Sequence, residues 1–239
     1  MRATVCLPTY NERENLGRMI EALAGVLREG DRVLVIDDGS PDGTGELADE
    51  LARTHPFLDV LHRPAKDGLG RAYLDGFRTV LATDAELILE MDCDFSHDPA
   101  DVPRLIEAAE GGADLVLGSR YVPGGGTRNW GLTRRLISKG GSVYTALFLR
   151  MGIRDPTGGF KCFRRDVLEA LDLDAVTAKG YAFQIELTYR AKQRGFRVVE
   201  VPITFVERTE GRSKMSRAIM LEAVWRVPLL RLRGLFGRL

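Results

Sequence analysis

Residues 87–99 read LILEMDCDFSHDP, an apolar run that passes directly into a cluster of acidic side chains and ends at a proline. Such a run is typical of a strand buried on both faces, here predicted over 85–92, and Pro99 suits the start of a helix. Similar runs predict further strands at 3–8, 32–37, 58–63 and 113–119. The amphipathic segments between them predict helices near 13–28, after Asp42, at 68–82 and at 100–110. This alternation predicts an α/β fold with a doubly wound, mostly parallel sheet and flanking helices.

The periodicity changes after residue 120. We expect a glycine-rich loop at 122–131, a helix at 132–149, a turn at 154–165, a helix at 180–194 and a strand at 197–208. The sequence has no internal repeat and no low-complexity linker. We therefore predict a single domain over residues 1–216, followed by an amphipathic helical tail at 217–239.

Composition narrows the class of protein. The chain has 239 residues, of which 44% are hydrophobic, with 34 basic and 34 acidic side chains, so no overall charge favours nucleic acid as a partner. Cys6, Cys93 and Cys162 are odd in number and far apart, which argues against disulfides or structural zinc and favours a reducing compartment. The apolar runs are too short for a signal peptide or a membrane span. We expect a cytoplasmic protein, with at most peripheral attachment to a membrane.

Asp92 and Asp94 follow the strand at its carboxyl end. Alternate residues of an extended chain point to the same side, so both carboxylates can face one cation, and Mg²⁺ or Mn²⁺ is the natural choice for oxygen ligands next to phosphates. The alternative is a solvated acidic turn, because the D-x-D pattern alone is weak. The same pattern at Asp172 and Asp174 follows a helix-like stretch, and we predict no role for it.

Polar groups also follow the first two strands, in PTYNERE (8–14) and DDGSPDGT (37–44). Ligands of such sheets bind at the carboxyl ends of the strands. Glu12 and Asp38 are suited to accept hydrogen bonds from a nucleoside, and Tyr10 to stack on its base. Either Asp42 or Ser40 is alternatively explained as a cap of the next helix.

Several segments together resemble a known family: PTYNE, VIDDGSPDGT, MDCDFSHDP, GSRYVPGG, DPTGGFKCFRR and the region from GYAFQIELTYR to GRSKMS. They are similar to family 2 glycosyltransferases of the GT-A fold and, more narrowly, to polyprenol (dolichol) monophosphate mannose synthases. The resemblance spans roughly residues 3–216. It implies transfer of mannose from GDP-mannose to a polyprenyl phosphate, with Mg²⁺ or Mn²⁺ and with inversion at the sugar.

The resemblance also implies roles for residues on the donor side. The nucleotide would be bound by Pro8, Tyr10, Glu12, Ile36 and Asp38. Asp92, Cys93 and Asp94 would hold the donor diphosphate with the metal. Ser96 is implied as a third metal ligand, although some relatives carry glutamine there. Arg208 and Lys214 would close on the donor phosphates.

On the acceptor side, Arg120 follows the fifth strand, and Arg134 and Ser138 are one helical turn apart on one face. The resemblance assigns these three residues to the lipid phosphate, so that Asp92, Asp94, Arg120 and Arg134 would be the catalytic set. Arg135 is expected to point elsewhere, into solvent. His97 is open to three interpretations: a metal ligand, a base or a structural residue at a helix start.

The tail has an apolar stripe with arginines on both sides. The stripe consists of Leu229, Leu232, Phe236 and Leu239, flanked by Arg231, Arg233 and Arg238. The pattern fits a helix lying in a membrane interface, and it fits equally a helix packed on the protein itself. Pro228 is expected to separate this helix from the preceding one. A membrane surface and a separate membrane anchor protein are thus candidate partners.

Three alternatives remain at this stage. The first is another sugar transferase, for example one that moves glucose from UDP-glucose to a lipid phosphate or a polysaccharide. The second is a sugar-1-phosphate nucleotidyltransferase, which PTYNERE disfavours because those enzymes begin with a loop rich in glycine and arginine. The third is a nucleotide-binding module without catalysis, which would not need the acceptor arginines.

Overall fold

The computed structural model describes residues 1–176, 180–207 and 217–236. Its strands are β1 (Ala3–Thr9), β2 (Arg32–Asp37), β3 (Leu58–His62), β4 (Leu87–Glu90), β5 (Leu115–Ser119), β6 (Gly126–Arg128), β7 (Lys161–Arg164), β8 (Val198–Pro202) and β9 (Thr204–Val206). Its helices are α1 (Arg13–Ala24), α2 (Thr44–Thr54), α3 (Leu69–Leu81), the 3₁₀ turn η1 (Pro99–Asp101), α4 (Val102–Glu110), α5 (Leu132–Leu149), α6 (Arg165–Ala170), α7 (Tyr181–Gln193) and α8 (Arg217–Leu235).

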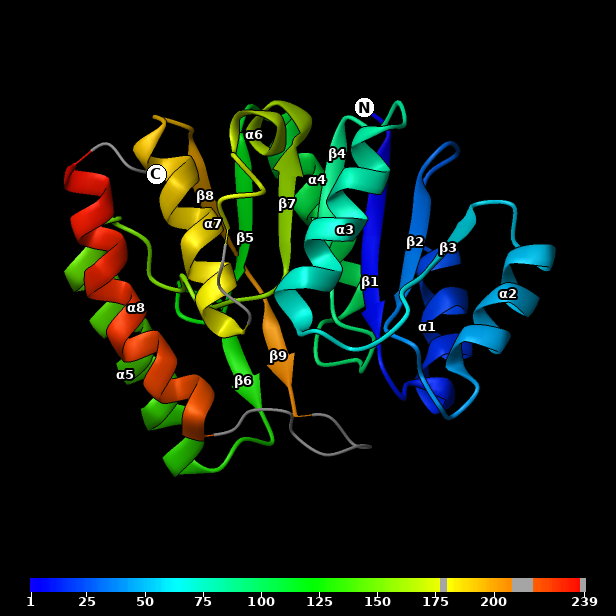
Figure 1. Cartoon of the computed structure of the whole chain (residues 1–239), viewed down its shortest axis with the longest axis horizontal. Helices are drawn as coiled ribbons and strands as arrows, with labels where there is room; N and C mark the ends of the chain where they lie inside the picture. The colour runs from blue at the N-terminus through cyan, green and yellow to red at the C-terminus, as the bar shows by residue number, and fades with distance from the viewer. Residues whose placement is uncertain (177–179, 208–216, 237–239) are drawn as a thin grey trace.

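Seven strands form the central sheet in the order β3-β2-β1-β4-β7-β5-β8 (Figure 1). The pairs β3-β2, β2-β1, β1-β4 and β5-β8 are parallel, and β7 runs antiparallel to both β4 and β5. The strands β1, β2, β4 and β5 are mostly buried and rich in valine, isoleucine and leucine, as expected of a sheet covered on both faces, whereas the edge strands β3 and β8 are partly exposed. The predicted α/β fold with a mostly parallel sheet is confirmed.

Strand β7 corrects the prediction of a turn over 154–165. Its sequence, KCFR, has no apolar run, and its first residue is a lysine with an exposed fraction of 0%. The fold tolerates that lysine because Lys161 Nζ donates to the main-chain oxygen of Gln184 at 2.7 Å and to its Oε1 at 2.5 Å. Burial lowers the pKa of Lys161 to about 8 and raises that of its strand partner Glu90 to about 7.

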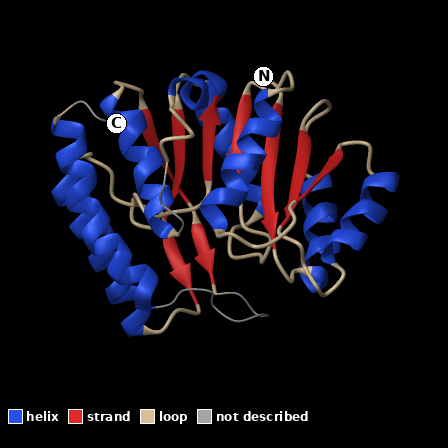
Figure 2. Cartoon of the chain, viewed as in Figure 1, coloured by secondary structure: helices blue, strands red, loops and turns tan. Residues whose placement is uncertain are grey.

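Helices cover both faces of the sheet (Figure 2). On one face, α1, α2 and α4 bury residues such as Leu16, Ala48 and Leu105 against the sheet. On the other face, α3, α6 and α7 do the same with residues such as Phe77 and Phe183. Helix α3 lies close to β2 at Gly76, which has no side chain. A Cβ atom added there would come within 2.3 Å of Ile36 Cδ1.

A small second sheet lies beyond the carboxyl ends of β5 and β8 (Figure 1). In it, β6 pairs in parallel with β9. The predicted strand 197–208 is therefore two strands, divided at Ile203, whose N–H donates to Ser119 O and whose carbonyl accepts from Gly126 N–H. The predicted glycine-rich loop at 122–131 likewise contains β6. Strand β6 of this small sheet lies between β5 of the central sheet and α5 in the sequence.

Helix α8 runs unbroken from Arg217 to Leu235 with Pro228 inside it, so the predicted separation at Pro228 is wrong. The helix packs against α5 and α7. Val227 and Leu230 join a core cluster with Leu149 and Tyr189, and these contacts hold the helix in place across the proline. On its outer side the helix exposes Leu229 and Leu232, and Phe236 follows directly after it, with exposed fractions of 46%, 52% and 73%.

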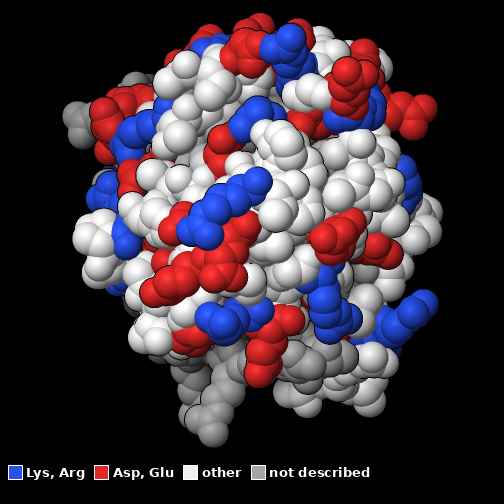
Figure 3. Space-filling view, turned by 90° about the vertical axis from the view of Figure 1, so that its right-hand side faces the viewer, with Lys and Arg blue, Asp and Glu red and all other residues white. Residues whose placement is uncertain are grey.

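Charges of both signs are interspersed on the face that includes α2 and β3 (Figure 3). The pairs Arg32–Asp59 and His62–Asp49 belong to this part of the molecule. Among the described helices, none combines the length and the apolar character that crossing a bilayer requires.

Candidate active site

The acidic loop follows β4, which ends at Glu90, two residues earlier than the predicted strand. The loop folds on itself: Asp94 Oδ1 accepts from the N–H of Ser96 at 3.0 Å and from its hydroxyl at 2.5 Å. Phe95 adopts a left-handed backbone with φ of 57°, a conformation that is common at functional sites. Asp94 is buried, whereas the side chain of Asp92 is 33% exposed.

His97 anchors this loop. Its ring is buried and stacked on Phe160, with the ring centroids 5.0 Å apart, and its Nδ1 accepts from the N–H of Asp92 at 3.2 Å. Burial lowers the pKa of His97 to about 4, so the ring is neutral at neutral pH. Of the three interpretations, the geometry supports the structural one, in which His97 fixes the main chain at Asp92.

A divalent cation fits the acidic loop by the chemistry of its donors. Within the described ranges, no group of three or more histidine, cysteine, aspartate or glutamate side chains is gathered as for a metal held by the protein alone. Mg²⁺ and Mn²⁺ need only one or two carboxylates when water and substrate phosphates supply the other ligands. Asp92 and Asp94 match that requirement. Ser96 donates to Asp94 and so orients it, and its role as a metal ligand stays a prediction.

The second group of predicted donor residues lies at the ends of β1 and β2, beside β4 in the sheet. The carboxylate of Asp38 is buried and ion-paired with Arg63, which also pairs with Asp75 at 2.8 Å. Desolvation raises the pKa of Asp38, and Arg63 offsets only part of this. The sequence analysis missed Arg63, because an arginine directly after the third strand carries no recognisable motif.

The other predicted donor residues differ in the burial of their side chains. Tyr10 is half-buried, with Lys66 Nζ 3.9 Å from its ring centroid, and Glu12 Oε2 accepts from Asn15 Nδ2 at 3.0 Å. Pro8 pairs with Ile36 in the register of β1 and β2. The side chains of Ile36 and Cys93 lie in the hydrophobic cores. A contact of these two residues with a nucleotide would therefore use their main chain.

The turn after β2 is held by its own side chains. Asp42 Oδ1 accepts from the N–H of Thr44 at 3.0 Å, which satisfies a donor at the start of α2. Ser40 instead donates its hydroxyl to Asp37 Oδ1 at 2.5 Å. Of the two candidate caps, Asp42 therefore serves the helix.

On the acceptor side, Arg120 is held by a buried carboxylate. Its Nε donates to Asp155 Oδ2 at 2.7 Å, and its Nη2 donates to Asp155 Oδ1 at 2.6 Å and to Thr157 Oγ1 at 2.9 Å. The ion pair lowers the pKa of Asp155 below its usual value, overcoming the opposing effect of burial. The direction of the Arg120 side chain is therefore fixed by Asp155, which the sequence analysis did not single out.

The two predicted acceptor arginines meet at Trp130. The guanidinium carbon of Arg120 lies 5.7 Å from the centroid of the indole ring, and that of Arg134 lies 4.3 Å from it. Arg134 also pairs with Glu207. Phe205 packs edge-on against both Trp130 and His97, at 5.3 Å and 5.2 Å, so a row of rings connects the acceptor arginines to the acidic loop. The structure thus brings together the predicted acceptor and metal residues.

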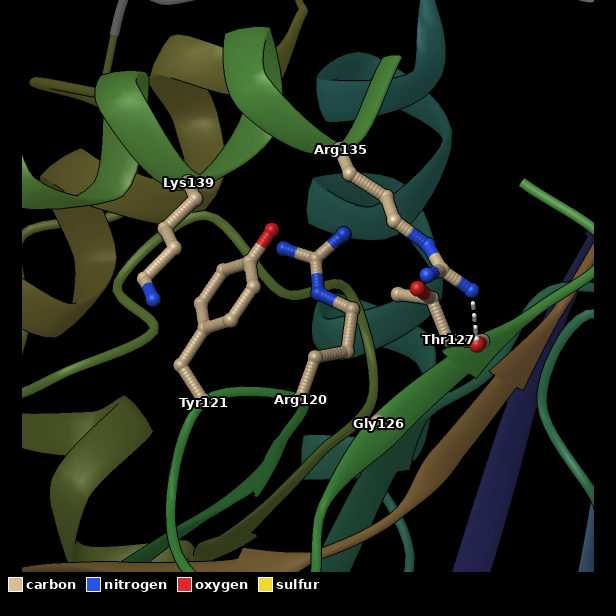
Figure 4. Close-up of a pocket in the computed structure, with 6 residues that line it drawn as sticks. All are labelled: Arg120, Tyr121, Gly126, Thr127, Arg135 and Lys139. Atoms are coloured by element: carbon tan, nitrogen blue, oxygen red, sulfur yellow. Dashed lines mark hydrogen bonds between the residues drawn. The ribbon is translucent and has the colours of Figure 1, made fainter. Parts of the chain in front are cut away.

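A cavity of about 350 Å³ opens beside Arg120 (Figure 4). It is lined by Arg120, Tyr121, Gly126, Thr127, Arg135 and Lys139. Arg135 is exposed, as predicted, but it does not point away from the site: its Nη2 donates to the main-chain oxygen of Thr127 at 3.1 Å. Ser138 faces Tyr121, whose hydroxyl donates to Ser138 Oγ at 2.8 Å. The spacing of four residues between Arg135 and Lys139 was the available sequence signal for this second pair.

Arg208 and Lys214, the predicted ligands of the donor phosphates, lie outside the described residues. Their roles stay predictions.

Several known proteins are similar to this chain. It is 51% identical to the polyprenol monophosphomannose synthase of Mycolicibacterium smegmatis, over 99% of this chain and 89% of that protein. It is 50% identical to the undecaprenyl-phosphate mannosyltransferase of Micrococcus luteus, over 94% of this chain and 91% of that protein. Both relatives thus span nearly the whole chain.

Among solved structures, the chain is similar to glucosyl-3-phosphoglycerate synthase from Mycobacterium tuberculosis in complex with Mn²⁺, UDP and glucosyl-3-phosphoglycerate. The TM-score is 0.65 at 21% identity, over 99% of this chain and 79% of that chain. This similarity confirms the expected GT-A fold. Residues 4–172 match the family described as Glycosyl transferase family 2. This chain belongs to glycosyl transferase family 2.

Proposed function

We propose that this protein transfers a mannosyl residue from GDP-mannose to a polyprenyl phosphate, giving polyprenyl monophosphomannose with inversion at the sugar. The sugar and the acceptor are inferred from the two relatives of about 50% identity, whose names specify mannose and a polyprenyl group. The observation that carries the proposal is the arrangement of Asp92 and Asp94 on one side and Arg120 and Arg134 on the other, linked by the row of rings from His97 to Trp130. A transfer between two phosphorylated molecules requires such a division.

In this reaction the bond between the anomeric carbon and the donor diphosphate breaks, while an oxygen of the acceptor phosphate forms the new bond. A divalent metal, when bound, stabilises the charge that develops on the departing diphosphate. Asp92 and Asp94 would hold that metal, with Mg²⁺ and Mn²⁺ both compatible with the donor set. Arg208 and Lys214 are proposed to contact the same diphosphate.

The acceptor needs positioning more than it needs a base. Phosphate monoesters have a second pKa of about 6, so the attacking oxygen is already ionised near neutral pH. Arg120, Arg134 and Ser138 are proposed to hold the phosphate in line with the sugar. Asp155 orients Arg120 through two hydrogen bonds of 2.6 Å and 2.7 Å, so the position of the Arg120 guanidinium is fixed before the acceptor binds.

The acceptor is a lipid, and we propose that the protein works at the cytoplasmic surface of a membrane. Exposed apolar side chains gather on α5 and α8, which pack against each other. They are Leu132, Leu136, Ile137, Val143, Leu147 and Phe148 on α5, and Trp225, Leu229, Leu232 and Leu235 on α8, with Phe236 directly after it. Arg231 and Arg233 on α8, with Arg150 directly after α5, would suit anionic headgroups. A separate membrane anchor protein is a further candidate partner.

The test is a transfer assay with the purified protein, a polyprenyl phosphate, Mg²⁺ or Mn²⁺, and either labelled GDP-mannose or labelled UDP-glucose. We expect label in the lipid fraction only with GDP-mannose, and none in the presence of excess chelator. Efficient transfer from UDP-glucose would instead favour the glucosyl alternative, and label from both donors that persists in chelator would contradict the metal-assisted mechanism.

A further inference from the structure

Three cationic side chains converge on the cavity beside Arg120 (Figure 4). Arg120 enters from the end of β5, while Arg135 and Lys139 enter from α5, one helical turn apart. The cavity volume of about 350 Å³ exceeds what one ordered water needs, so the cavity can admit a ligand group.

Two of the three positive charges of this cavity have no neighbouring carboxylate among the described residues. Arg120 is neutralised by Asp155 behind it. In the part of the chain that the structure describes, neither Arg135 nor Lys139 has a carboxylate partner, whereas several arginines on other elements do. Examples of such paired arginines are Arg28, Arg32, Arg63, Arg78, Arg104 and Arg165. Two unbalanced cations facing one hollow attract an anion there.

The shape of the surroundings defines that anion. An arginine fork and a lysine ammonium together suit a phosphate, which offers several oxygens to both. At about 100° per residue, Arg135 and Lys139 lie directly beside the stripe of Leu132 and Leu136, whose exposed fractions are 77% and 73%. A phosphate in the cavity would therefore leave room for an attached apolar chain along α5. Free phosphate would use only the cationic half of this arrangement.

We propose that Arg135 and Lys139 form a docking subsite for the phosphate of the lipid acceptor, next to Arg120 and separate from Arg134. This inference rests on the proposed function, because it names where the acceptor binds first. Arg135 is about 100° from Arg134 around α5, so the two arginines serve different faces of the helix. Arg134 contacts Trp130 and Glu207, whereas Arg135 contacts Thr127 at the cavity rim.

The division predicts different kinetic effects for neighbouring arginines. Arg135→Gln and Lys139→Gln should each raise the acceptor KM about tenfold, as expected for the loss of one charge-assisted contact, with kcat at saturating acceptor preserved. Arg134→Ala should lower kcat. Lys139→Arg should retain the wild-type acceptor KM, because it keeps the charge.

A direct binding measurement distinguishes phosphate binding at the subsite from membrane adhesion and from effects on the transfer reaction. A short-chain, water-soluble isoprenyl phosphate and inorganic phosphate are each titrated into the full chain by calorimetry, without vesicles or detergent. Arg135→Gln, Lys139→Gln and the double variant are compared with Arg128→Gln, an exposed arginine of β6 that does not line the cavity. We expect about tenfold weaker isoprenyl phosphate binding for each single variant, a larger loss for the double variant and no change for Arg128→Gln. Inorganic phosphate should bind more weakly than the isoprenyl phosphate and lose affinity in the same variants.

Three results of these measurements would contradict the docking subsite. Wild-type affinity of the double variant for the soluble isoprenyl phosphate would overturn the proposal, as would an equal loss in Arg128→Gln. A loss seen only with anionic phospholipid vesicles would assign the two cations to membrane adhesion and likewise overturn it. Unchanged melting temperature and unchanged GDP-mannose binding show that each variant is folded. If the wild-type protein binds isoprenyl phosphate through Arg135 but transfers no mannose, the docking subsite stands and the proposed function fails.

Discussion

The buried carboxylate of Asp155 determines where Arg120 points, and it does so from a position with an exposed fraction of 0%. Its oxygens also accept from the main-chain N–H of Arg120 at 2.9 Å and from Thr157 Oγ1 at 3.2 Å. Removing one member of a buried ion pair leaves the other charge without compensation. At the scale of single residues, the acceptor side of the site therefore depends on a side chain that contacts no substrate in the proposed reaction.

We expect Asp155→Asn to lower the free energy of unfolding at pH 7 by about 3–5 kcal/mol, because Arg120 then remains buried without its partner. The pKa of Asp155 is lower in the folded than in the unfolded state. Its contribution is therefore fully present above the unfolded-state pKa and disappears as the pH falls through the lower folded-state pKa. Urea unfolding as a function of pH should show the difference from wild type shrinking in acid. Asp174→Asn, at an exposed ion pair, is the matched control and should change stability by less than about 1 kcal/mol. A difference that is the same at all pH values would contradict this account.

Asp92→Asn and Asp94→Asn should each reduce transfer by roughly a thousandfold or more, since each removes a carboxylate that is proposed to hold the metal. Asp172→Asn tests the other D-x-D sequence of the chain. Among the described residues, the Asp172 carboxylate accepts from the N–H groups of its own turn, at Asp174 and Ala175, and activity should persist in this variant. Labelled product in the lipid fraction is the readout, with melting temperature as the check on folding. Full activity of Asp94→Asn in excess chelator would remove the metal from the mechanism.

Sequence reasoning at this scale found the residues that belong to recognisable motifs. The structure brings Arg120 and Arg134 to one indole ring and places the acidic loop at the end of a buried strand, as the motifs predict. It could not find Arg63 or Asp155, because their partners come from distant parts of the sequence. It correctly expected Arg135 to be exposed but did not find that Arg135 lines the cavity beside Arg120, since helical spacing gives the angle around α5 and not which residues lie opposite.

At the scale of elements, the approach of α3 to β2 depends on a residue without a side chain. A Cβ at Gly76 would lie 2.3 Å from Ile36 Cδ1 and 3.3 Å from its Cγ1, and Ile36 is fully buried. Gly17, in α1, has no such neighbour within 4 Å. The two glycines thus occupy similar positions in their helices and opposite environments.

This contrast gives a paired prediction. Gly76→Ala should destabilise the fold by about 1–3 kcal/mol, because Ile36 must move within a packed core. Gly17→Ala should stabilise it by about 0.5–1 kcal/mol, through helix propensity alone. Thermal unfolding of both variants is the measurement. Equal shifts in the same direction would show that the α3–β2 contact does not limit packing.

The order of elements was largely predictable, because most of the parallel strands contain an apolar run and most of the helices have an amphipathic period. Strand β7 was not, since KCFR lacks such a run and its lysine is satisfied by Gln184, which lies on α7 and far away in the sequence. The division of the last strand at Ile203 and the continuity of α8 through Pro228 also depend on tertiary contacts. Local sequence does not encode these contacts.

At the scale of the whole molecule, α5 and α8 combine an inner side that packs on the core with an outer apolar side. Both interpretations of the tail therefore apply to its described residues: Val227 and Leu230 pack inward, and Leu229, Leu232 and Phe236 face outward. The family assignment followed from motifs spread along the chain. The association with a membrane is a prediction from these exposed side chains.

Leu136→Gln combined with Leu232→Gln should reduce co-sedimentation with anionic vesicles and leave the melting temperature unchanged. Each leucine contributes up to about 1.5–3 kcal/mol when fully buried, and shallow insertion captures a part of that. Leu230→Ala, on the inner side of α8, is the contrasting variant: it should lower stability by about 2–5 kcal/mol. Binding should also weaken with salt, as arginine–headgroup attraction is screened. Unchanged vesicle binding of the Leu136/Leu232 variant would contradict membrane association through α5 and α8.

The position of β7 in the sheet has a consequence for how the chain folds. Strands β4 and β5 do not pair with each other; each pairs with β7, whose residues are synthesised last of the three. Until residues 161–164 have left the ribosome, β4 and β5 both present unpaired backbone edges, and such edges invite pairing with other chains. The first four strands can assemble early from neighbouring segments, whereas joining them to β5 and β8 requires closure over a long sequence separation, which is slow. Completion of the sheet, and with it of the site that spans both halves, is therefore a late event in folding, and a nascent chain halted before β7 is the form most exposed to aggregation.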